Sequence, residues 1–67
     1  MNQKQLILKR LRRGPLTPLL AIRELGILTL SQRCGELRRA GHNIHSTYVR
    51  VRNRYGKYAR VKRYWLA

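Results

Sequence analysis

The sequence is poor in acids and cysteine, and these shortages exclude several kinds of protein. Glu24 and Glu36 are its only acids, which leaves too few carboxylates for paired acid–base catalysis. Zinc needs about four ligands, and Cys34, His42 and His45 do not supply them. We therefore expect no metal site, no cofactor, no small-molecule substrate and no enzymatic activity.

Disulfides and membrane spans are missing as well. A single cysteine cannot form an intrachain disulfide, which is typical of a reducing compartment. No stretch approaches the roughly 18 uncharged apolar residues that a membrane span requires. Lys9, Arg10, Arg12 and Arg13 interrupt the apolar segment that a signal peptide would need. We expect an intracellular protein that has no membrane partner.

Positive charge, by contrast, is in large excess. Sixteen Lys and Arg residues face two acids and give a formal net charge of +14. Self-repulsion on this scale destabilises a compact monomer unless a polyanion neutralises it. Duplex DNA carries one negative charge per ~1.7 Å of axis, and Arg fits phosphates and guanine edges with paired hydrogen bonds. The charge favours a nucleic-acid partner, although anionic lipid or ribosomal RNA would satisfy the same sign.

The length of 67 residues and the hydrophobic fraction of 43% predict a single small domain over 1–67 with a thin core. A first helix is expected at about 3–13, capped by Asn2 and ended by a Gly-Pro pair. A second is expected at about 18–25, where Thr17-Pro18 is a typical helix start and Gly26 a typical helix end. This second helix is apolar almost all round, and we expect it to be mostly buried.

A third helix, at about 30–40, is predicted to be amphipathic. Thr29 and Gln32 have the spacing of a capping box at its start. Its apolar stripe consists of Leu30, Cys34 and Leu37. Its other face is polar and basic, with Arg33 and Glu36 at the margins: Ser31, Gln32, Gly35, Arg38 and Arg39.

The last third of the chain predicts an antiparallel β-hairpin with strands at about 44–52 and 58–66. Valines alternate with arginines between Val49 and Arg52, so one face should be apolar and the other basic. Ile44 is out of phase with these valines, which predicts a bulge or a loop near His45 and Ser46.

Helix, short helix, tight turn, amphipathic helix and hairpin form the plan of a helix-turn-helix unit with a wing. The chain resembles the small winged helix-turn-helix domains of bacteriophage and prophage genes. The resemblance covers about residues 14–66, and its most specific part is the run Leu30-Ser31-Gln32-Arg33 … Glu36-Leu37-Arg38 … Gly41. It implies an α+β fold, double-stranded DNA binding, and a role in phage-type transcriptional regulation. A cytoplasmic, nucleoid-associated location in a bacterium or phage-infected host goes with it.

The predicted mechanism places helix 30–40 in the major groove and the 52–60 wing on the adjacent backbone or minor groove. Gln32 and Arg33 are the expected base readers, and Ser31 the expected phosphate contact. The predicted recognition-helix contacts are Thr29, Ser31, Gln32, Arg33, Gly35, Arg38 and Arg39. The predicted wing contacts are Arg50, Arg52, Arg54, Lys57, Arg60 and Lys62.

Two other functions fit the same residues. One is an architectural DNA-bending factor or excisionase in site-specific recombination, and the other is a small basic RNA-binding or ribosome-associated protein. Tyrosines of the hairpin suggest a platform for single-stranded bases, but the sequence does not fix the positions of Tyr48 and Tyr58 firmly enough to support one. A homodimer and a cooperative assembly on DNA both stay open.

Overall fold

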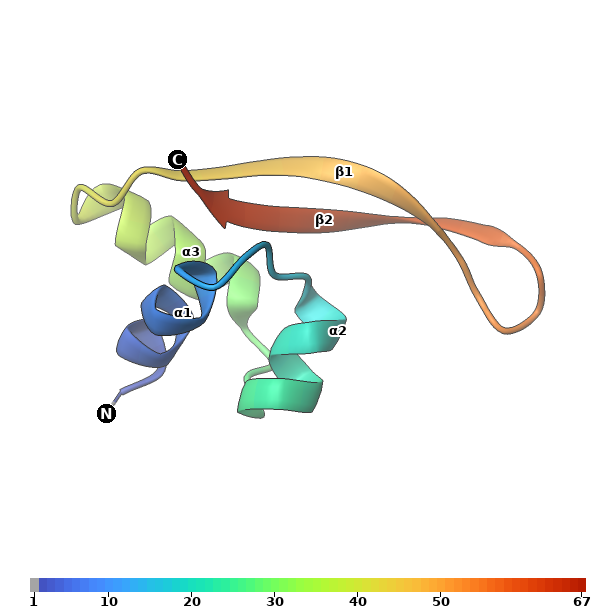
Figure 1. Ribbon diagram of the computed structural model, residues 1–67, viewed down its shortest axis with the longest axis horizontal. Helices are drawn as coiled ribbons and strands as arrows, with labels where there is room; N and C mark the ends of the chain where they lie inside the picture. Colours follow the sequence, from blue (N-terminus) through green and yellow to red (C-terminus); the bar gives the residue numbers. More distant parts are fainter. Residues whose placement is uncertain (1) are drawn as a thin grey trace.

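The computed structural model describes residues 2–67 and shows helical segments followed by a two-stranded antiparallel sheet (Figure 1). This α+β order of elements is the one predicted from the sequence. The helical elements are α1 (Gln3–Leu11), α2 (Pro18–Leu20), the π-helical turn η1 (Ala21–Leu25) and α3 (Leu30–Arg39). The strands are β1 (Ile44–Arg52) and β2 (Tyr58–Leu66). None of the helices within residues 2–67 is long and apolar enough to cross a membrane.

Helix α1 begins at a complete capping box. The Asn2 side chain accepts a hydrogen bond from the Gln5 amide at 2.9 Å, and the Gln5 side chain accepts one from the Asn2 amide at 3.0 Å. The helix ends at Leu11, two residues earlier than expected. The reason is that the Arg13 and Gly14 amides bond to carbonyls three residues back, which tightens the last turn.

The second helix begins as predicted, because the Thr17 hydroxyl accepts a hydrogen bond from the Leu20 amide at 3.3 Å. It continues through η1 and ends at Gly26, whose φ of +68° is the left-handed conformation that favours glycine. The expectation that this helix is mostly buried is wrong. Leu19 is 61% and Ile22 43% exposed, because a helix this short packs only one edge on the core, where Ala21 lies.

The core lies between the helices and the base of the hairpin. Leu16 joins it by a β-bridge to Tyr64, with two backbone hydrogen bonds of 2.8 Å, so the segment after α1 lies along the outer edge of β2. Removal of this apolar surface from water is the main stabilising contribution in a domain so small. The buried residues are Ile7, Leu11, Leu16, Ala21, Ile27, Leu30, Cys34, Leu37, Ile44 and Tyr64.

The two strands pair without interruption from Ile44 opposite Leu66 to Arg52 opposite Tyr58, so the predicted bulge or loop is wrong. Ile44 and Tyr64 lie on one face, which covers the core at the base of the hairpin. The valines lie on the other face, farther out. One face of the twisted hairpin is apolar at its base and the other is apolar farther out. Ile44 can therefore be out of phase with the valines without an extra residue in the strand.

Candidate nucleic-acid interface

Helix α3 presents an apolar stripe to the core and a polar stripe to solvent. Leu30, Cys34 and Leu37 are buried. Gln32, Gly35 and Arg39 lie on the opposite side at helical spacing, with the side chains of Gln32 and Arg39 exposed. Gly35 has no side chain of its own in the middle of this outward stripe. The flexible Arg39 side chain lies over it, with Nε donating to the Gly35 carbonyl oxygen at 3.3 Å, and a ligand that displaces this side chain can approach the helix backbone closely.

Arg38, on the flank of α3, connects the helix to the hairpin. Its Nε donates to the Ile44 carbonyl oxygen at 2.7 Å, and its Nη2 donates to Ser46 Oγ at 3.1 Å. Both acceptors are on β1. Because one planar guanidinium makes both hydrogen bonds, it restrains the orientation of the helix relative to the strand. The sequence predicted Arg38 as a contact residue and did not reveal this bridge.

Arg33 lies on the α1 side of the helix. Its Nε donates to Gln3 Oε1 at 3.1 Å, and its Nη1 pairs with Glu36 Oε1 at 2.8 Å. This hydrogen bond from Arg33 holds the pKa of Glu36 below its usual value. The structure thus places Arg33 beside α1 instead of on the outward stripe with Gln32 and Arg39.

Thr29 occupies the N-cap position of α3 and is exposed. The predicted capping box with Gln32 is wrong, because within residues 2–67 the Thr29 side chain makes no capping hydrogen bond. The Thr29 backbone, at φ −110° and ψ +42°, is outside the extended region that N-cap residues usually adopt. The Gln32 amide is therefore not used to close the helix end.

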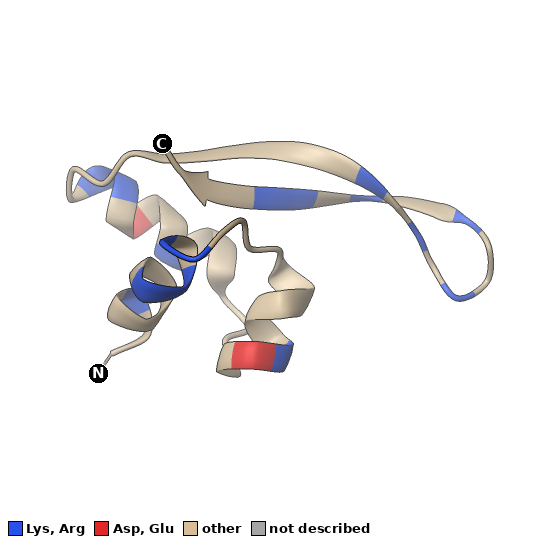
Figure 2. Cartoon of the chain, viewed as in Figure 1, with Lys and Arg blue, Asp and Glu red and all other residues tan. Residues whose placement is uncertain are grey.

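The hairpin carries the predicted row of cations. Figure 2 shows basic residues along both strands and in the connecting loop, and the loop itself is held by Asn53, whose Oδ1 accepts hydrogen bonds from the Tyr55 and Lys57 amides. Arg54 and Lys57 lie in this loop, as expected. Arg50, Arg52, Arg54, Lys57 and Arg60 are exposed, and Lys62 is half-buried.

The pairing register gives the hairpin two different faces. Tyr48 and Lys62 are directly opposite each other, as are Arg50 and Arg60, and all four lie on the same face as Ser46. This face is therefore continuous with the flank of α3 that carries Arg38. The other face has Val51, Ala59 and Val61, which line an apolar groove with Pro18 and Leu19.

Cys34 reports on the electrostatics where helix and hairpin meet. Burial raises the pKa of its thiol to about 11, while the charges of Arg38 and Lys62 act in the opposite direction. Lys62 and Arg38 therefore lie near the same point of the core, from β2 and α3 respectively. At neutral pH the thiol is protonated and buried, which makes it a packing residue and a poor nucleophile.

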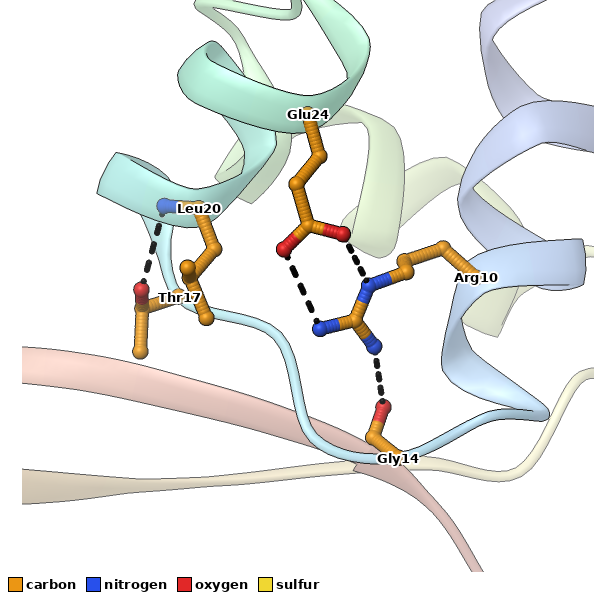
Figure 3. Close-up of polar contacts among 5 residues, drawn as sticks. All are labelled: Arg10, Gly14, Thr17, Leu20 and Glu24. Carbon is orange, nitrogen blue, oxygen red and sulfur yellow. Dashed lines mark hydrogen bonds and ion pairs between the residues drawn. The ribbon is translucent and has the colours of Figure 1, made fainter.

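The other acid of the sequence, Glu24, is exposed and is paired with Arg10 of α1. Arg10 Nε and Nη2 donate to the two Glu24 carboxylate oxygens at 2.9 and 3.4 Å, and Arg10 Nη1 donates to the Gly14 carbonyl at 3.1 Å (Figure 3). The Arg10 hydrogen bond lowers the pKa of Glu24. Glu36 is paired with Arg33 and also interacts with the charge of Arg39, so both acids are engaged by arginines of the helices and neither is paired with a cation of the hairpin.

This combination of an outward polar helix, a tight turn before it and a basic hairpin beside it matches a known family. A family model for the winged helix-turn-helix domain matches residues 2–67. The chain belongs to the winged helix-turn-helix family. The winged helix-turn-helix domain is a DNA-binding family, and α3 and the β1–β2 hairpin have the positions of its recognition helix and its wing in chain order. No curated protein and no solved structure matches the chain significantly.

The histidine and tyrosine side chains of the winged helix-turn-helix domain are the remaining candidates for specific contacts. His45 stacks on Trp65 with ring centroids 5.8 Å apart. Across residues 2–67, no three His, Cys, Asp or Glu side chains lie close enough to hold a metal ion. The sequence alone did not fix the positions of the tyrosines of the wing. Only the strand register, which puts Tyr48 and Tyr58 on the same face as the arginines, shows what surrounds them.

Proposed function

We propose that this winged helix-turn-helix protein binds duplex DNA with α3 in the major groove and the wing on the neighbouring backbone or minor groove, and that it regulates transcription in the manner of phage-type regulators. The observation that carries the proposal is the Arg38 bridge from α3 to β1. It joins the two basic elements into one surface, whereas separate elements would meet DNA independently. Both acids of the sequence are paired with arginines of the helices, and the protein's charge of +14 supplies the attraction.

Within α3 we assign base reading to Gln32 and Arg39 and phosphate contact to Thr29 and Ser31. Gln pairs with adenine and Arg with guanine in the major groove, and both side chains are exposed on the outward stripe. Gly35 lets the helix come close to the base pairs. Base reading by Arg33, expected from the sequence, would require it to leave Gln3 and Glu36.

Arg38 contributes its position and its charge, and the wing contributes its cations to phosphates. A protein that neutralises about 6–10 phosphates loses roughly three to five decades of affinity between 50 and 200 mM salt. A slope near zero on duplex DNA would refute the proposal. Competition with structured RNA decides the RNA-binding alternative, since an RNA-binding protein would prefer the structured RNA.

Selection of bound sequences from a random duplex pool tests sequence preference, half-site symmetry and spacing together. We expect an enriched motif of a few base pairs. Arg39→Ala should then weaken the enriched site more than random DNA, while Arg33→Ala should weaken both equally because Arg33 acts on the scaffold. Equal losses for Arg39→Ala would assign that residue to the backbone.

The architectural role is a second candidate, favoured by the number of cations on the wing relative to α3. Such a protein gains affinity from bent DNA and tolerates sequence change. Footprinting separates the two roles. A single short protected site, with or without dyad symmetry, fits a regulator, and a phased array of protected sites fits an architectural factor that assembles cooperatively.

A further inference from the structure

The wing holds like charges next to each other on its two strands. Arg50 and Arg60 are directly opposite each other on neighbouring strands, and like charges in that position destabilise a sheet. The sequence offers no acid to separate them, because Glu24 and Glu36 are paired with Arg10 and Arg33.

The two arginine side chains instead point away from each other, and each packs on the tyrosine that lies diagonally across from it on the neighbouring strand. The Arg60 Cζ lies 4.6 Å from the centre of the Tyr48 ring, and the Arg50 Cζ lies 4.6 Å from the centre of the Tyr58 ring. Both distances are within the range of cation–π attraction, which is about 6 Å. Each guanidinium is therefore held in one position over a tyrosine ring on the exposed face of the wing.

Lys62 extends the same arrangement toward α3. Its Nζ lies 5.8 Å from the Tyr48 ring centre and 5.7 Å from the Tyr64 ring centre. Tyr64 is buried, whereas Tyr48 is 57% and Tyr58 63% exposed. We call this set the tyrosine–cation ladder, and its members are Tyr48, Tyr58, Tyr64, Arg50, Arg60 and Lys62.

We propose that the tyrosine–cation ladder is a preorganised binding site for the phosphodiester backbone, in which Tyr48 and Tyr58 are positioning residues that hold Arg50 and Arg60. Long basic side chains lose rotamer freedom when they bind phosphate. A guanidinium that is already ordered on a ring loses less, so the affinity rises although the ring need not touch DNA. This inference rests on the proposed duplex binding and explains how the wing achieves it.

The rings could alternatively stack on unpaired bases. The geometry favours the ladder, because cations already lie over the rings of both Tyr48 and Tyr58. Stacking on bases would also give the protein a preference for single strands, which the ladder does not. The two uses therefore predict different losses when the rings are removed.

The test compares two double variants on one duplex. The variant Tyr48→Phe with Tyr58→Phe keeps both rings and should bind within about twofold of the natural chain. The variant Tyr48→Leu with Tyr58→Leu keeps the bulk without the rings and should bind about five- to thirtyfold more weakly, from two exposed cation–π contacts. Its salt slope should be unchanged, because the arginines still reach phosphate.

The control is Arg50→Gln with Arg60→Gln, which should lower the magnitude of the salt slope by about two, since each lost phosphate contact removes ~0.9. Without DNA, the Arg Nε–H signals of Arg50 and Arg60 should be ordered in the Phe variant and averaged in the Leu variant. Amide spectra verify that each variant is folded.

Equal duplex affinities for the Leu and Phe variants would overturn the ladder, and so would a larger loss on single-stranded than on duplex DNA for the Leu variant. These outcomes leave the proposed function standing. A salt slope that the arginine control does not alter would overturn the ladder as well, because Arg50 and Arg60 would then not contact phosphate. A natural chain that fails to bind duplex DNA would instead overturn the proposed function.

Discussion

Gly35 is the position where stability and function should respond in opposite directions. It lies in the middle of α3 (Leu30–Arg39), where glycine destabilises a helix by roughly 0.5–1 kcal/mol relative to alanine. A Cβ built there meets only the flexible end of Arg39, with Nη2 at 3.8 Å. Nothing in the fold therefore requires glycine, and the proposed close approach of DNA does.

Gly35→Ala should stabilise the protein by about 0.5–1 kcal/mol, a rise of roughly 2–8 °C in Tm for a domain of this size. Gly35→Leu should remain folded, because the flexible end of Arg39 is the group near the Cβ and can move aside. On DNA, however, the leucine side chain would occupy the groove that the helix enters. Steric overpacking costs about 1–3 kcal/mol, which corresponds to a loss of roughly 5- to 150-fold in affinity.

Thermal unfolding followed by circular dichroism and binding followed by fluorescence anisotropy measure the two effects on the same samples. Lys9→Leu, an exposed change on α1, shows what a surface leucine and one lost charge do away from the proposed interface. If Gly35→Leu bound duplex DNA no more weakly than Lys9→Leu, the outward stripe of α3 would not face the groove.

Three further predictions follow from the polar and buried groups. Arg38→Ala should lower the free energy of unfolding by about 1 kcal/mol and reduce DNA affinity, whereas Arg38→Lys, which restores charge without the two-point bridge, should recover the salt slope but not the affinity. Because the pKa values of Glu24 and Glu36 are lowered, their contribution to stability is present above the usual carboxyl pKa of 4.5 and lost as pH falls below it; urea titrations from pH 7 to 3 would contradict this if stability were flat. Cys34, with its pKa raised to about 11, should react with a thiol reagent at pH 8 only after unfolding, and rapid labelling of the native protein would refute its burial.

Much of the fold could be read from local sequence signals. Asn2, Thr17 and Gly26 each mark a helix end by chemistry that acts over a few residues, and the structure confirms all three. The buried stripe of α3 follows from helical spacing alone. The hairpin strands have the predicted bounds, because turn residues and β-branched residues delimit them.

The wrong predictions concern features that depend on tertiary packing, which a short stretch of sequence does not reveal. Ile44 is out of phase with the valines because it lies on the face of the hairpin that packs on the core, whereas the valines lie on the other face, farther out. Leu19 and Ile22 are exposed because a short helix has more apolar residues than the core can cover.

The candidate site was predictable in its residue types and less so in their roles. Arg33 and Arg38 look equivalent in the sequence, yet one pairs with α1 and the other bridges to β1. Their roles depend on which elements flank α3. The tyrosine–cation ladder likewise depends on cross-strand register, which only a paired hairpin specifies.

The most direct test of the account is an NMR titration of the natural chain with a short duplex from the random-pool selection. The proposed surface predicts that backbone amides of residues 29–39 and side-chain Nε–H signals of Arg39, Arg50 and Arg60 shift together and saturate at one stoichiometry. Signals of α1 and of the exposed Leu19 side of α2 should stay in place. Shifts that concentrate on α1 and α2 while α3 and the wing remain unchanged would contradict the account.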